Sequence, residues 1–116
     1  MAVKMTTHVL DTASGKPANG MRIEFYRVLP EGIELINHGV TNTDGRLDAP
    51  LNTGHDFDEG TYRLLFYVGD YFASVGHADA KKFLDIVPIQ FVVDKPGAYH
   101  VPLLVSPWSY STYRGS

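Results

Sequence analysis

The sequence predicts an all-β fold, a two-sheet antiparallel sandwich of about eight strands with one short helix. Three observations support this prediction. Apolar and polar residues alternate over short runs, which is the period of a strand that buries one face. Turns rich in glycine, proline, asparagine and aspartate separate these runs. No β-helix-β alternation repeats along the chain, so a parallel sheet is not expected.

The predicted strands and helix follow from these runs and from the turns that separate them. In chain order we expect strands at 3–11, 21–28, 33–41 and 61–68, a helix at 69–82 interrupted near residue 76, and strands at 84–94, 98–106 and 108–113. Asp70 is the expected N-cap of the helix, because its side chain can accept a hydrogen bond from the first backbone amides. Pro88 favours an edge position for its strand, because proline donates no ladder hydrogen bond. The loop at 51–60 is polar, with Asp58 and Glu59 expected in solvent.

Length, net charge and composition limit the classes of function that the chain can have. A chain of 116 residues predicts one domain, spanning 1–116. The net charge is −3 without a basic cluster, which argues against nucleic acid as a partner. The absence of cysteine excludes disulfides, thiolate catalysis and cysteine-based zinc sites. No run is long enough to span a membrane or to serve as a signal peptide, so we expect a cytoplasmic protein; a removed leader or peroxisomal targeting stays open.

Two of the five histidines differ from the rest in where the pattern places them. His8 and His100 each fall on the non-core face of a predicted strand, whereas His38, His55 and His77 fall at a strand end, in a loop and at a helix end. The alternative for both is a surface histidine on a half-exposed sheet. The histidines show neither His-x-His nor a helical pair, so no metal site is predicted.

Arginines and aromatic residues stand at two further places. Arg46 follows the Asp44-Gly45 turn directly, at the mouth of a short loop, and its simpler interpretation is a turn arginine. The chain ends in aromatic residues and Arg114, where a solvated tail would be expected, and this favours a C-terminus inserted into another part of the protein. The simpler interpretation of Arg114 is a charged tail.

Four stretches of the chain carry more specific motifs. They are T-T-H-V-L-D-T-A-S-G-K-P-A at 6–18, T-D-G-R at 43–46, G-T-Y-R-L-L-F-Y-V-G-D-Y-F at 60–72 and Y-H-V-P-L-L-V-S-P-W-S-Y-S-T-Y-R-G-S at 99–116. Together they resemble the 5-hydroxyisourate hydrolases, the transthyretin-related proteins of purine catabolism. The terminal Y-R-G-S is the most specific part, because the hormone-carrying transthyretins lack it.

The resemblance implies a transthyretin-like sandwich and a homotetramer, a dimer of dimers, with active sites in the channel where the dimers meet. It implies hydrolysis of 5-hydroxyisourate to 2-oxo-4-hydroxy-4-carboxy-5-ureidoimidazoline in urate degradation, by metal-free opening of a cyclic amide and without a cofactor. A transthyretin-type small-molecule carrier without catalysis is the alternative, since one fold serves both functions. A sandwich that serves only as an interaction module is a third hypothesis.

The resemblance also implies the site. It assigns catalysis to His8, Arg46, His100 and Ser116, and substrate binding to His8, Arg46, Tyr113 and Arg114. An imidazole suits a general base near neutral pH, but the sequence leaves open which histidine acts. Arg46 would stabilise the oxyanion that forms on addition of water. Ser116 would orient the water or relay a proton, and Tyr113 would pack on the ring or hydrogen-bond to it.

Overall fold

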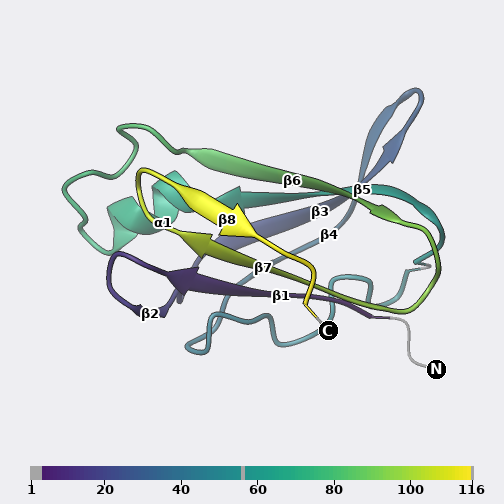
Figure 1. The fold of residues 1–116 in the computed structure, drawn as a ribbon, viewed down its shortest axis with the longest axis horizontal. Coiled ribbons are helices and arrows are strands. Elements are labelled where there is room, and N and C mark those ends of the chain that lie inside the picture. The colour runs from purple at the N-terminus through teal and green to yellow at the C-terminus, as the bar shows by residue number, and fades with distance from the viewer. Residues whose placement is uncertain (1–3, 56, 116) are drawn as a thin grey trace.

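Two four-stranded sheets pack against each other as two layers, with one helix at the end of the sandwich (Figure 1). The structure, a computed structural model, describes residues 4–55 and 57–115. The elements are β1 (Lys4–Asp11), β2 (Lys16–Pro17), β3 (Arg22–Leu29), β4 (Gly32–Val40), β5 (Gly60–Tyr67), α1 (Val68–Ser74), β6 (Ile86–Val93), β7 (Ala98–Val105) and β8 (Tyr110–Thr112). The predicted sandwich is confirmed. Among the described residues, no helix is long and apolar enough to cross a membrane.

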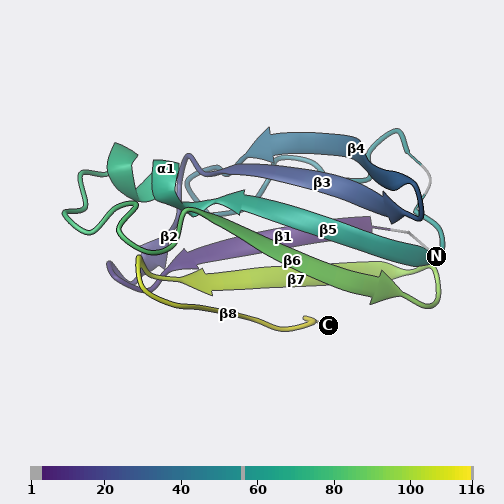
Figure 2. The ribbon, with the colours of Figure 1, turned by 90° about the horizontal axis from the view of Figure 1, so that it is seen from above.

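The strand order is β2-β1-β7-β8 in one sheet and β4-β3-β5-β6 in the other, and Figure 2 shows the two layers from the side. Every pair is antiparallel except β1 with β7, which is parallel. Parallel neighbours need a long connection, and nearly the whole chain separates these two strands. The expectation of purely antiparallel sheets is wrong at this pair. Pro88 lies in β6, an edge strand, as predicted.

The core lies between the inner faces of the sheets. It includes Met5 and Val9 of β1 and Leu103 of β7, all without measurable exposure. The 51–60 loop was predicted to be polar, and Asp58 and Glu59 are exposed as expected. Two of its apolar residues are nevertheless buried in the core, Leu51 and Phe57. Isolated apolar residues in a loop have no periodicity, so the pattern could not reveal this.

The helix is shorter than predicted. It begins at Val68, directly after β5, and ends at Ser74, before Gly76 with its φ of 75°. Asp70 does not cap it, so that prediction is wrong. The residue lies within the first turn, where a carboxylate favours the helix dipole, and its Oδ1 pairs with Nζ of Lys81 at 2.7 Å.

Candidate active site

Three polar side chains share the outward face of the β2-β1-β7-β8 sheet. In the parallel β1–β7 register, Thr6 is opposite His100, and His8 is opposite Pro102. Side chains alternate along a strand and paired residues project to the same face, so Thr6, His8 and His100 lie together. All three are half-buried, while the alternate residues of β1 are buried in the core. The predicted face of both histidines is confirmed.

A turn brings Arg46 to the edge of β1. The backbone carbonyl of Gly45 accepts a hydrogen bond from the amide of Val9 at 2.9 Å, and His8 and Arg46 form an antiparallel bridge. Gly45 has a φ of 74°, and a Cβ there would lie 2.5 Å from the carbonyl oxygen of Val9. Glycine is therefore required twice, for the left-handed conformation and for the close approach. The side chain of Asn42 braces the turn by accepting from the Arg46 amide at 3.2 Å.

Thr6, Arg46 and His100 border one hollow. It has a volume of about 320 Å³ and is lined by Lys4, Thr6, Arg46, Ala98, Tyr99 and His100. Two of its lining residues are in contact, since Oγ1 of Thr6 lies 2.9 Å from Nδ1 of His100. Burial lowers the pKa of His100, and the positive charges of Arg46 and then His8 lower it further. The neutral imidazole is therefore the main form near neutral pH, which is the form that accepts a proton.

The C-terminal tail follows β8 back along β7. The amide of Gly115 donates a 2.7 Å hydrogen bond to the carbonyl of His100, and the two residues form a bridge. The guanidinium carbon of Arg114 lies 4.1 Å from the centroid of the ring of Tyr99, a residue that also lines the hollow. Tyr113 is 60% exposed. Ser116 lies outside the described residues.

Residues 5–115 match the family model described as Transthyretin: HIUase/Transthyretin family. The chain belongs to the HIUase/Transthyretin family. It is 52% identical over 113 residues to the 5-hydroxyisourate hydrolase of Deinococcus radiodurans, covering 97% of this chain and 95% of that protein. Its structure superposes on (S)-allantoin synthase with a TM-score of 0.88 and 48% identity, covering 97% of this chain but only 43% of that one. Transthyretin from Sparus aurata matches with a TM-score of 0.85 and 25% identity, covering 98% of this chain and 97% of that one.

The structure brings together three of the six predicted site residues, namely His8, Arg46 and His100. The sequence analysis did not name Thr6, whose hydroxyl contacts His100, as a candidate site residue. The pattern that could have indicated it is the alternation of β1, which puts Thr6 on the same face as His8. Among residues 4–55 and 57–115, no group of three histidine, aspartate or glutamate side chains is placed to hold a metal ion.

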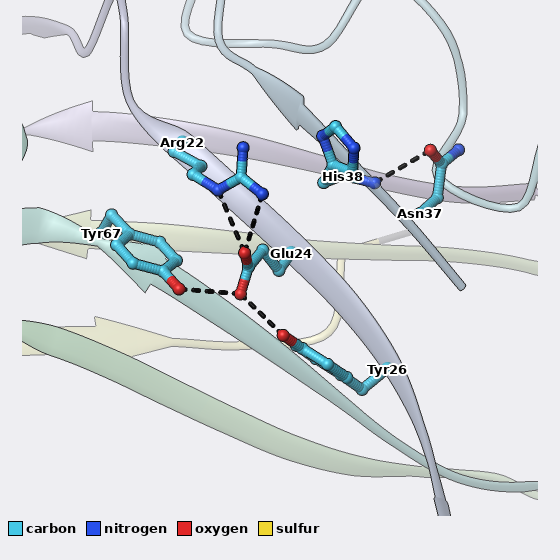
Figure 3. Close-up of polar contacts among 6 residues, drawn as sticks. All are labelled: Arg22, Glu24, Tyr26, Asn37, His38 and Tyr67. Carbon is cyan, nitrogen blue, oxygen red and sulfur yellow. Dashed lines mark hydrogen bonds and ion pairs between the residues drawn. The ribbon is translucent and has the colours of Figure 1, made fainter. Parts of the chain in front are cut away.

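A second polar cluster lies on the other sheet, around the buried carboxylate of Glu24 (Figure 3). Its Oε2 accepts from Nε and Nη2 of Arg22 at 3.0 and 2.8 Å, and its Oε1 accepts from the hydroxyls of Tyr26 and Tyr67, both at 2.8 Å. Burial opposes ionisation, but the hydrogen bonds from Tyr26, Tyr67 and Arg22 outweigh it and lower the pKa of Glu24. Four donors occupy both carboxylate oxygens, so this cluster holds strands together and has no acceptor left for a ligand.

Proposed function

We propose that this protein hydrolyses 5-hydroxyisourate to 2-oxo-4-hydroxy-4-carboxy-5-ureidoimidazoline in urate degradation. The observation that carries the proposal is His100, whose lowered pKa and position beside the Arg46 guanidinium suit a general base in a polar hollow. The named activity of the Deinococcus radiodurans relative, at 52% identity, supports the same reaction.

The chemistry needs no group beyond the chain and water. Nε2 of His100 takes a proton from water while the water oxygen bonds to the carbonyl carbon of the cyclic amide. The negative charge that develops on the carbonyl oxygen is stabilised by Arg46, which stays cationic. The C–N bond then breaks, and the leaving nitrogen takes a proton from His8 or from the imidazolium of His100. We assign the base to His100, since its neutral form is favoured.

A carrier of transthyretin type is the alternative, since the fold also matches a transthyretin. The hydrolase is favoured because identity to the named hydrolase is 52%, against 25% to that transthyretin. A carrier also gives no reason for a low-pKa histidine beside an arginine. Saturable ligand binding without turnover would support the carrier.

We also propose a homotetramer, a dimer of dimers. β6 and β8 are edge strands of the two sheets, and unpaired edges can pair with another chain. Phe83 and Trp108 stack with ring centroids 6.2 Å apart while 68% and 52% exposed, as expected of an uncovered interface. Leu10 and Leu104 stay half-buried on the outward face that carries the histidines, although Pro102 is already buried. Light scattering should give four times 12.9 kDa; a monomer mass in active samples would refute this.

The ultraviolet decay of freshly made 5-hydroxyisourate tests the enzyme directly. We expect the protein to accelerate this decay and the His100→Gln variant to lose at least about a hundredfold of the rate. His38→Gln is the matched control, because His38 is exposed on the other sheet. Decay at the buffer rate with the intact protein would reject the proposal. Cytoplasmic location stays a prediction, which fractionation of source cells would check.

A further inference from the structure

We propose that Thr6 is a positioning residue for His100: its hydroxyl holds the imidazole with Nε2 free for the reaction and keeps its hydrogen bond when the ring gains a proton. This rests on the proposed function only for the identity of the reaction. The contact itself is between Oγ1 of Thr6 and Nδ1 of His100, 2.9 Å apart.

The backbone fixes this contact. Thr6 and His100 are direct neighbours in the parallel β1–β7 register, so their side chains leave the sheet side by side. A β-branched side chain in a strand has few χ1 choices, which limits where the hydroxyl can point. Thr7, the next residue, faces the core and donates to the carbonyl of Val101 at 2.7 Å. The two threonines therefore have separate partners, and only Thr6 touches a site residue.

The hydroxyl suits both protonation states of the ring. A neutral imidazole that acts as a base through Nε2 carries its hydrogen on Nδ1, which donates to Oγ1 of Thr6. After Nε2 takes a proton, Nδ1 still donates to the same oxygen. The opposite tautomer would receive the hydroxyl hydrogen at Nδ1 and would leave Nε2 unable to accept. Threonine can therefore support catalysis without rearrangement only as the acceptor.

An uncharged partner also preserves the base. A carboxylate at Nδ1 would stabilise the imidazolium and oppose the effects of burial, Arg46 and His8 on the ring. Among the residues that the structure describes, Lys4, Arg46 and Tyr99 line the hollow with His100, and Arg46 and His8 are the two whose charge acts on its ring. The residues that line the hollow include no acid. Thr6 thus orients His100 without adding negative charge.

The test compares Thr6→Val, which keeps the shape and removes the hydroxyl, with Thr6→Ser, which restores the hydroxyl. We expect Thr6→Val to lower kcat by about 10- to 100-fold, the loss of a hydrogen bond to a group that becomes charged, with little change in KM. Thr6→Ser should recover most of kcat. Thr61→Val is the matched control, a strand threonine on the other sheet.

The nitrogen chemical shifts of the His100 ring give a readout that does not depend on activity. We expect hydrogen on Nδ1 in the wild type and in Thr6→Ser, and a mixture of tautomers in Thr6→Val. A wild type that is inactive on 5-hydroxyisourate but keeps this tautomer pattern would reject the reaction and retain the positioning role. Unchanged kcat and unchanged shifts in a folded Thr6→Val would overturn the role. If Thr6→Val fails to fold, Thr6→Ala replaces it with the same expected outcomes.

Discussion

The backbone of Gly115 lies directly against the ring of His100, so that a Cβ at position 115 would be 2.6 Å from Cδ2 of the imidazole. We therefore predict that Gly115→Ala displaces either the ring or the tail and lowers kcat/KM by about a hundredfold, as small displacements of a reacting group do. The melting temperature should change little, because the described contact of Gly115 is one backbone hydrogen bond, to the carbonyl of His100, outside the core. Gly97→Ala is the control, since a Cβ there meets nothing within 4 Å. Full activity of Gly115→Ala would show that the close contact between Gly115 and the His100 ring is not needed for catalysis.

Gly45→Ala should both destabilise the fold and remove activity. The left-handed backbone alone costs about 1 kcal/mol for alanine, and the contact with the Val9 carbonyl adds to it. Because Gly45 docks the turn on β1, the change should also move Arg46 away from His8. Gly15→Ala separates the two effects, because Gly15 has a φ of 75° but an open space around it. Unfolding curves and the kinetics of hydrolysis are measured on both variants. Equal losses of stability and of activity in Gly45→Ala and Gly15→Ala would show that the close approach of Gly45 to the Val9 carbonyl contributes nothing.

The titration of His100 should respond to the charge of Arg46. Its pKa lies below the ordinary 6.5 through burial first and then through Arg46 and His8, so the acid limb of kcat/KM should lie below pH 6.5. Arg46→Gln removes one cation and should raise the pKa toward 6.5, whereas Arg46→Lys should keep it low. Arg46 is exposed, so added salt should weaken the effect. The pKa of His100 is measured from its proton chemical shifts as a function of pH. Identical titrations of the wild type, Arg46→Gln and Arg46→Lys would show that the charge of Arg46 does not lower the pKa of His100.

Glu24→Gln should remove an acid-sensitive part of the stability. Its folded pKa is lowered from 4.5, so the ionised carboxylate contributes stability that is present above pH 4.5 and lost as the pH falls through the folded value. The difference in melting temperature between wild type and Glu24→Gln should thus be largest near pH 7 and shrink in acid. Glu59→Gln, at an exposed loop position, should show no such trend. A constant difference at every pH would exclude this account.

Strand alternation was sufficient to place His8 and His100 each on the outward face of its own strand, because that period is set by the backbone. It could not show that Thr6 is opposite His100, since the register of two strands so far apart in the chain depends on the whole fold. Alternation also could not predict where the side chain of Arg114 packs, because this residue lies beyond the last strand. The resemblance groups this residue with the site, which stays a prediction, and the structure adds that its guanidinium packs on the ring of Tyr99, next to His100 in β7.

A chelator should leave the activity unchanged, because the proposed reaction uses only side chains and water. Dialysis against a chelator, followed by the decay assay, checks this. Restoration of lost activity by zinc would instead make His8 and His100 ligands and would overturn their role as acid–base groups. An excess of zinc added to the untreated protein is the control for inhibition by the metal itself.

Removing residues 113–116 should abolish catalysis while leaving the fold intact. The described contacts that hold this tail are the Gly115 amide on His100 and the Arg114 guanidinium on Tyr99, together about 1–2 kcal/mol. The tail still shapes the surroundings of His100, so its loss should cost at least about a hundredfold in rate. Arg114→Ala separates anchoring from chemistry: it should loosen the tail and lower the rate less than truncation does. Hydrolysis, melting temperature and mass are measured on both variants. A fully active truncated protein would remove the tail from the site, and a truncated protein that is inactive only because it dissociates would make the tail an assembly element.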